Sequence, residues 1–161
     1  MDQTDIETAI RKLPQLKSSH WKIAIAVEHG CHSIKAIMAA TGYGYETVKD
    51  YLSEIYAAVG IENLLQLSIV MCWNKFLRKP AAVKQSGKPL KSLLALPDLA
   101  VVALIAEGHT IVRIAAVFTV TRDVLNNWLS RINRKAGCSD RFELAESALR
   151  ERFLALHSAE Q

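Results

Sequence analysis

The side chains most able to bind a metal ion stand together in the short stretch His29-Gly30-Cys31-His32. Imidazole and thiolate groups are ligands that zinc prefers, but these three would still need a fourth ligand from elsewhere in the chain. A turn between two helices explains the same residues more simply. We therefore expect no metal and no cofactor.

Patterns typical of catalytic centres do not occur in the sequence. It contains no phosphate-binding GxxxxGK[ST] loop, no GxSxG nucleophile turn and no HExxH zinc motif. Its three cysteines, Cys31, Cys72 and Cys138, are far apart and form no CxxC pair, which favours a reducing compartment. The N-terminus lacks the basic start and apolar run of a signal peptide, and no stretch has the ~18 apolar residues of a membrane span. We expect a cytoplasmic protein that is not an enzyme and has no membrane partner.

The net charge of +4 is unevenly distributed along the chain. Residues 80–161 hold 11 Lys/Arg against 8 Asp/Glu, whereas residues 1–79 hold 9 against 8. Between the halves, residues 79–92 carry several lysines, two prolines and a glycine but no acid, which predicts a basic and mostly unstructured linker. This balance favours an anionic partner without identifying it.

Two stretches of the chain repeat one apolar pattern at an offset of 77 residues. Residues 47–55 read TVKDYLSEI and residues 124–132 read VLNNWLSRI, with apolar or aromatic side chains at the same places. Upstream, Gly30 and Gly108 match at an offset of 78, so the first copy has one extra residue in the turn after Gly30. Such self-similarity predicts two related domains.

Helical spacing of apolar residues predicts four helices in each copy. They are expected at 17–29, 33–41, 45–58 and 62–77, and again at 95–107, 110–118, 121–135 and 140–156. Ser33, Thr110 and Thr121 are suitable N-caps. The predicted fold class is all-α, with two small four-helix domains at 16–78 and 93–161, the linker at 79–92 and an N-terminal segment, 1–15, that is compatible with a short helix over 3–13.

Both copies resemble LuxR/GerE-type helix-turn-helix domains. The family pattern is an apolar helix ending in A-E-G, a short second helix, a turn, and then T-V-K-x-H-L-x-x-I-x-x-K-L-G-V. The matching residues are TVK at 47–49, LSEIY at 52–56, AEG at 106–108 and KAG at 135–137. This resemblance covers residues 16–77 and 94–156, and it implies four-helix domains whose third helix enters the DNA major groove.

The resemblance also implies which positions face the groove. In the first copy these are Lys49, Asp50 and Ser53, next to Thr47. There Asp50 and Glu54 would repel phosphates, although an aspartate can accept a hydrogen bond from cytosine. The first copy is therefore the less convincing DNA reader.

The residues of the second copy favour DNA contact more clearly. Leu125, Trp128, Leu129 and Ile132 share one face of the expected helix 121–135, which leaves the other face polar. Asparagine pairs bidentately with adenine, and arginine pairs with guanine or phosphate. An ordinary solvated helix face would look similar. The expected contacts are Arg122, Asn126, Asn127, Ser130, Arg131, Arg134 and Lys135.

The fourth helix of the first copy poses a separate problem, because residues 64–73, LLQLSIVMCW, are apolar on nearly all sides. One small domain is not expected to bury every face of such a helix. The second copy, a second chain in a homodimer or a foreign protein could cover it. The expected interface residues are Leu64, Leu67, Val70, Met71 and Trp73.

Two functions follow as hypotheses. The first is a sequence-specific transcriptional regulator that binds duplex DNA as a covalent pseudo-dimer or as a homodimer. The second is a protein-binding module, such as an anti-activator or co-regulator, that grips another transcription regulator or an RNA polymerase subunit. The acidic third helix of the first copy motivates the second hypothesis.

Overall fold

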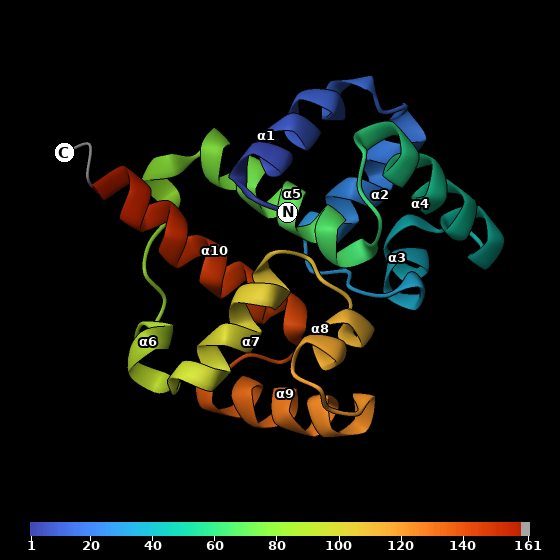
Figure 1. Ribbon diagram of the computed structural model, residues 1–161. Coiled ribbons are helices and arrows are strands. Elements are labelled where there is room, and N and C mark those ends of the chain that lie inside the picture. Colours follow the sequence, from blue (N-terminus) through green and yellow to red (C-terminus); the bar gives the residue numbers. More distant parts are fainter. Residues whose placement is uncertain (159–161) are drawn as a thin grey trace. The chain divides into compact units, whose positions relative to one another are not determined.

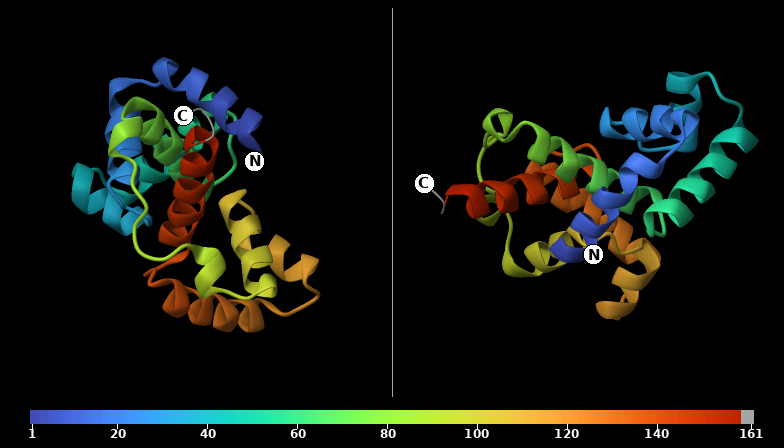
Figure 2. Two further views of the ribbon diagram at one scale, coloured as in Figure 1. Left: turned by 90° about the vertical axis from the view of Figure 1, so that its left-hand side faces the viewer. Right: turned by 90° about the horizontal axis from the view of Figure 1, so that it is seen from above.

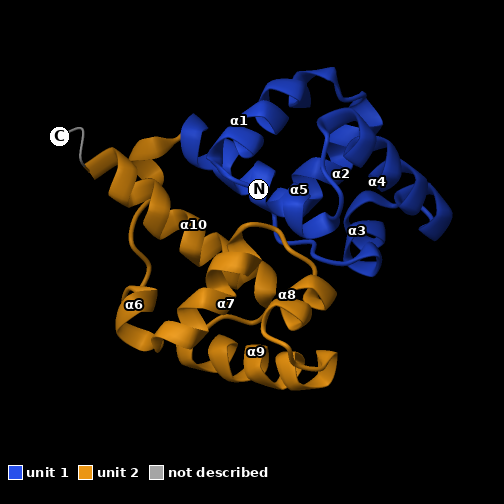
Figure 3. Cartoon of the chain, viewed as in Figure 1, with its two compact units in different colours: residues 1–78 blue, residues 79–161 orange. Residues whose placement is uncertain are grey.

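The fold is seen in a computed structural model that describes residues 1–158 (Figure 1). This part of the chain contains helices and turns but no β-strand, so the predicted all-α class is confirmed. The chain divides into two compact units, residues 1–78 and 79–161, which Figure 3 colours separately. Each unit is described by itself.

Unit 1 (residues 1–78) contains five α-helices. They are α1 (Gln3–Lys12), α2 (Ser18–Glu28), α3 (Ile34–Thr41), α4 (Tyr45–Val59) and α5 (Leu64–Arg78), with a 3₁₀ turn, η1 (Leu13–Gln15), after α1. Helix α2 packs against α3, α4 and α5, while α1 packs against α4 and α5 (Figures 1 and 2). The segment 1–15 is therefore a structural part of unit 1. Its capping box, in which Asp2 and Asp5 bond each other's backbone N–H at 2.9 Å, sets the start of α1.

The hydrophobic core of unit 1 contains several of the expected interface residues. Leu67, Val70 and Met71 are fully buried in one cluster with residues of α2 and α4, and Ala9 and Leu13 belong to the same cluster. Leu64 is half-buried against it. Because α1 and η1 join this core, the side of α5 that carries Leu67, Val70 and Met71 is not available to a second chain. Trp73, expected in the same interface, is also buried.

Unit 2 (residues 79–161) has a similar set of helices. They are the short α6 (Leu90–Leu93), then α7 (Leu96–Ala106), α8 (Ile111–Val117), α9 (Arg122–Ala136) and α10 (Arg141–Ser158). Helix α10 packs along α7 and also contacts α9, and α8 packs against α9 (Figure 1). Its fully buried apolar side chains include Val101, Ile105, Ile114, Leu125, Leu144 and Leu149.

The offset of 77 residues in the sequence is also an offset between equivalent backbone features. Ser33 and Thr110 cap α3 and α8, each side chain accepting from the backbone N–H three residues later. Gly42 and Thr119 both adopt positive φ, 76° and 54°, in the turns before α4 and α9. A positive φ is uncommon for a residue other than glycine. Thr119 adopts it at the position equivalent to Gly42, so the two turns have the same backbone geometry. The two units thus repeat one local design.

The predicted linker is more ordered than expected near both of its ends. Residues 79–92 were expected to be mostly unstructured, but they include the 3₁₀ turn η2 (Pro80–Ala82) and most of α6. Leu90 is buried, and its backbone N–H donates to Glu151 of α10 at 2.7 Å. The end of the segment is thereby held against α10, since a buried backbone N–H needs an acceptor.

Within residues 1–158, no single helix is long and apolar enough to cross a membrane. Helices α4 and α5 are long and apolar enough only when taken together, and the chain bends by 61° at the break between them.

Candidate nucleic-acid interface

Helix α9 begins at a well-defined turn. The Thr121 hydroxyl caps it by accepting from the backbone N–H of Val124 at 3.3 Å. Thr119 turns the chain in the left-handed region just before this cap. The helix ends at Gly137, which also has positive φ, 69°. Both ends are therefore set locally, and the 15 residues between them form one continuous helix.

The buried and exposed sides of α9 differ in polarity. Leu125, Leu129 and Ile132 are buried. The residues of α9 that were predicted to contact DNA are all exposed, and six of them, without Lys135, form one polar surface. We call this surface the polar face of α9, and it consists of Arg122, Asn126, Asn127, Ser130, Arg131 and Arg134.

Asp98, in the first turn of α7, holds α9 against the rest of unit 2. Its carboxylate accepts from Trp128 Nε1 at 2.7 Å and from Lys135 Nζ at 3.2 Å. The hydrogen bond from Trp128 is the main reason why the pKa of Asp98 lies below its ordinary value, and Lys135 adds to the effect. Phe118 packs edge-on against Trp128, with ring centroids 5.2 Å apart. Sequence reasoning placed Trp128 in the core but missed Asp98, which looked like an ordinary acid.

Lys135 was expected to supply charge to a phosphate. Its ammonium instead forms an ion pair with Asp98, although the side chain remains half exposed. The pair leaves Lys135 a weaker contributor to the positive potential than Arg131 and Arg134, for which the structure describes no acidic partner within residues 1–158.

Arg141, at the start of α10, is a cation that the sequence did not single out. Its guanidinium lies over the Phe142 ring at 5.4 Å. Burial lowers the pKa of Arg141; Asp140 raises it and the charge of Arg122 lowers it. The influence of Arg122 indicates that Arg141 contributes to the same positive region as the N-terminal end of the polar face of α9.

The corresponding face of α4 in unit 1 is also exposed. Lys49, Asp50 and Ser53 are accessible, while Thr47 is only half exposed. The Ser53 hydroxyl donates to the Lys49 carbonyl at 3.1 Å, as the Ser130 hydroxyl donates to the Asn126 carbonyl at 3.1 Å. Both serines can still accept a hydrogen bond, but their protons are engaged in the helix.

Glu54 of α4 has a structural partner in unit 1. Its carboxylate lies 2.7 Å from Nε2 of His20, which is buried at the start of α2. The His20 ring packs edge-on against Tyr51, with centroids 5.2 Å apart. His20 and Asp98 occupy equivalent places in the two units, as do Tyr51 and Trp128. In each unit, a polar residue near the start of one helix, α2 or α7, contacts the aromatic side chain of another, α4 or α9.

Helices α4 and α9 carry different charges at equivalent positions. Glu46, Asp50 and Glu54 of α4 correspond, at the offset of 77, to Asp123, Asn127 and Arg131 of α9. Continuing along the helix, an exposed alanine of α4 corresponds to Arg134. At these four positions unit 1 therefore presents three acids and an alanine, whereas unit 2 presents one acid, an amide and two arginines. The faces share geometry but have opposite charge.

Three valines on α8 and α9 are exposed. Val112 and Val117 on α8 and Val124 on α9 have 65%, 59% and 49% of their surface accessible. A valine at an exposed helix position near DNA can contact a thymine methyl group, whereas the same residues would also suit an apolar protein surface.

The stretch His29-Gly30-Cys31-His32 holds neighbouring side chains of the kinds that bind metal ions. Among residues 1–158, no group of three or more His, Cys, Asp or Glu side chains is placed to hold a metal ion. The backbone explains the motif as a turn, since Gly30 has a φ of 95° and both Gly30 and Cys31 donate to carbonyls of the last turn of α2.

Comparison of the chain with family models, with curated proteins and with solved structures finds no match.

Proposed function

We propose that this protein is a transcriptional regulator that binds duplex DNA, with the polar face of α9 as its principal contact. In this proposal α8, the turn at Thr119 and α9 form a helix-turn-helix of the LuxR/GerE type, and α9 enters the major groove. Helices α3 and α4 form the equivalent motif in unit 1. The resemblance of the sequence motifs and the repeated backbone geometry support the assignment.

One observation carries the proposal: α9 exposes asparagines and arginines together on a face that has no acid beyond Asp123. Asn126 and Asn127 suit adenine, and Arg131 and Arg134 suit guanine or phosphate. Arg122 and the neighbouring Arg141 add positive charge near the N-terminus of the helix. Asp98 and Trp128 would position the helix without touching DNA.

The two units would act on one duplex as a covalent pseudo-dimer, or two chains would act as a homodimer. Helices that read successive major grooves on one side of the duplex are ~34 Å apart. Because α4 carries Glu46, Asp50 and Glu54, we expect unit 1 to contribute less affinity than unit 2. Its Lys49 remains a candidate contact to a base.

The test is fluorescence anisotropy of the full chain on a random-sequence duplex pool, titrated with salt, followed by sequencing of the bound fragments. Binding should weaken steeply with salt, with a slope of about −0.9 for each phosphate contact. Enrichment of one sequence, or of two half-sites, would support a specific regulator. Weak binding without enrichment at physiological salt would contradict the proposal.

Charge reversal of the polar face gives a sharper comparison. Arg131→Glu with Arg134→Glu should lower DNA affinity by about tenfold or more for each arginine. The matched control is Arg11→Glu with Lys17→Glu, which makes the same change of net charge at exposed positions of unit 1. Equal losses in both double variants would point to net charge alone, and the polar face of α9 would not be the reader.

A second function, a protein-binding module, is favoured by the exposed Glu46 and Asp50 of α4. Such a face would suit a basic surface of another regulator or of an RNA polymerase subunit. Reversing these two acids to lysine should abolish such a complex. If the protein instead reads DNA through both units, the same reversal should strengthen DNA binding, so one pair of substitutions separates the two functions.

A further inference from the structure

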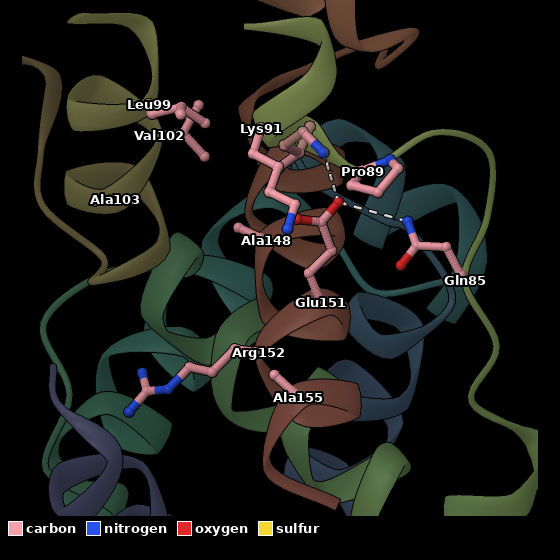
Figure 4. A pocket seen from close by; sticks show the side chains of 11 residues that line it. Gln85, Pro89, Lys91, Leu99, Val102, Ala103, Ala148, Glu151, Arg152 and Ala155 are labelled. Carbon is pink, nitrogen blue, oxygen red and sulfur yellow. Dashed lines mark hydrogen bonds between the residues drawn. The ribbon is translucent and has the colours of Figure 1, made fainter. Parts of the chain in front are cut away.

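Unit 2 contains a groove that DNA contact by α9 does not use. It has a volume of about 520 Å³ and lies between α7, α10 and the segment that leads into α6 (Figure 4). This volume is within the ~300–1,000 Å³ range of small-molecule sites. Its lining residues are Gln85, Pro89, Leu90, Lys91, Leu99, Val102, Ala103, Ala148, Glu151, Arg152 and Ala155.

Small side chains leave the groove open. Ala103 on α7 and Ala148 and Ala155 on α10 line it where larger residues would fill the space between the two helices. Beneath them, Val102 and Leu90 are almost completely buried and form an apolar floor. A ligand with an apolar body would therefore bury its own surface and that of the walls without displacing any side chain.

One wall of the groove is fixed by Glu151. Its Oε1 accepts from the backbone N–H of Leu90 at 2.7 Å and from Nε2 of Gln85 at 3.5 Å (Figure 4). Two points of the incoming segment are thus held against α10. The wall is preformed, so a ligand does not have to order it.

The charges of the lining favour an anion. Lys91 and Arg152 are exposed and outnumber Glu151, the one acid among the lining residues, so the lining carries a net positive charge. Lys91 extends from the start of α6 beside this carboxylate (Figure 4). We propose that the groove binds a small organic anion with an apolar body, such as a medium-chain carboxylate. The apolar body would lie on Leu99, Val102 and Ala103, and the acid group would lie by Lys91.

The proposal does not depend on DNA binding, and it is tested on the full chain with decanoate as the probe. Amide chemical shifts followed by NMR should saturate and should map to residues 90–103 and 148–155. Decanol, which has the same chain length without the charge, should bind several-fold more weakly. Absence of saturation, shifts spread over unit 1, or equal binding of decanol would each overturn the proposal.

Matched variants locate the site. Ala103→Trp should fill the groove and weaken decanoate binding by about tenfold or more, since it blocks the apolar contact. Ala100→Trp is the control, because Ala100 is also exposed on α7 but does not line the groove. Circular dichroism would check that both variants keep the helical fold. Equal affinity of the two variants would place the ligand elsewhere.

The role of the cation is tested separately. Lys91→Gln should weaken decanoate about two- to fivefold, as expected for an exposed ion pair, and should leave decanol unchanged. Lys88→Gln is the matched control, because Lys88 is exposed in the same segment but outside the lining. If both variants bound decanoate like the unaltered protein, the anion would not be recognised at Lys91, and the proposed chemistry would be wrong.

Discussion

Trp128 of α9 donates its indole N–H to the carboxylate of Asp98 on α7 over 2.7 Å, and this bond joins the two helices. Asp98 is only 7% exposed, so its charge is tolerated because Trp128 and Lys135 both donate to it. Trp128 points inward from the same helix whose other side carries the asparagines and arginines. The pair therefore fixes the rotation of that polar face.

Replacing Asp98 by alanine should destabilise the protein by about 1.5–3 kcal/mol, because a hydrogen bond to a charged group is lost and the indole N–H loses its acceptor. The free energy of unfolding from urea titration measures the change. Trp128→Phe provides the matched background, in which the donor is already absent. In that background Asp98→Ala should cost clearly less, and equal costs would mean that the two side chains are not coupled.

Low pH should reduce the free energy of unfolding by protonating the Asp98 carboxylate. Hydrogen bonds from Trp128 and then Lys135 outweigh burial and hold the pKa of Asp98 below its usual value. The unfolded chain titrates at about 3.9, so below about pH 4 it binds a proton more readily than the folded chain. Stability from Asp98 is present above that pH and is lost as the pH falls through the folded pKa. Urea titrations between pH 6 and 2.5 should show that the free energy of unfolding declines less for Asp98→Asn than for the unaltered protein. Parallel declines would contradict a lowered pKa for Asp98.

Leu13 should be as important to unit 1 as a residue of its central helices. It is 2% exposed and belongs to the core cluster that contains Val70 and Met71. Leu13→Ala should cost about 2–5 kcal/mol of unfolding free energy, through lost burial and the cavity left behind. Leu77→Ala, at a position that is 45% exposed, is the comparison and should cost far less. Similar losses would show that the N-terminal segment is not part of the core.

Gly42 should resist substitution because of its backbone alone. A Cβ at this position would meet no atom within 4 Å, but its φ is 76°. Gly42→Ala should therefore destabilise unit 1 by about 1–2 kcal/mol. Gly44, two residues later, also has open space but a φ of −73°, so Gly44→Ala should cost less, about 0.5 kcal/mol, because alanine is a poorer N-cap than glycine for α4. Thermal unfolding of the two variants measures the difference, and equal shifts would exclude the backbone explanation.

Much of the local structure could be predicted from the amino-acid sequence. The eight main helices lie close to their expected ranges, and the caps at Ser33, Thr110 and Thr121 form as expected. These features depend on residues within a few positions of each other, such as a hydroxyl and the backbone N–H three residues later. The exposed face of α9 follows in the same way from helical periodicity, because its apolar residues determine which side is buried.

Contacts between residues distant in sequence were not predictable in this way. The sequence shows that Leu67, Val70 and Met71 need cover, but only the tertiary structure shows that α1 and η1 help to supply it. Likewise, Asp98 looks like a solvated acid until Trp128 and Lys135 are brought to it from about 30 and 37 residues away. By itself the sequence determined the helices, the repeat and the polarity of each helix face, because these are set by local geometry. The tertiary structure alone decided which apolar faces are covered, which acid anchors α9 and where small side chains leave a groove, because such outcomes depend on the packing of distant segments.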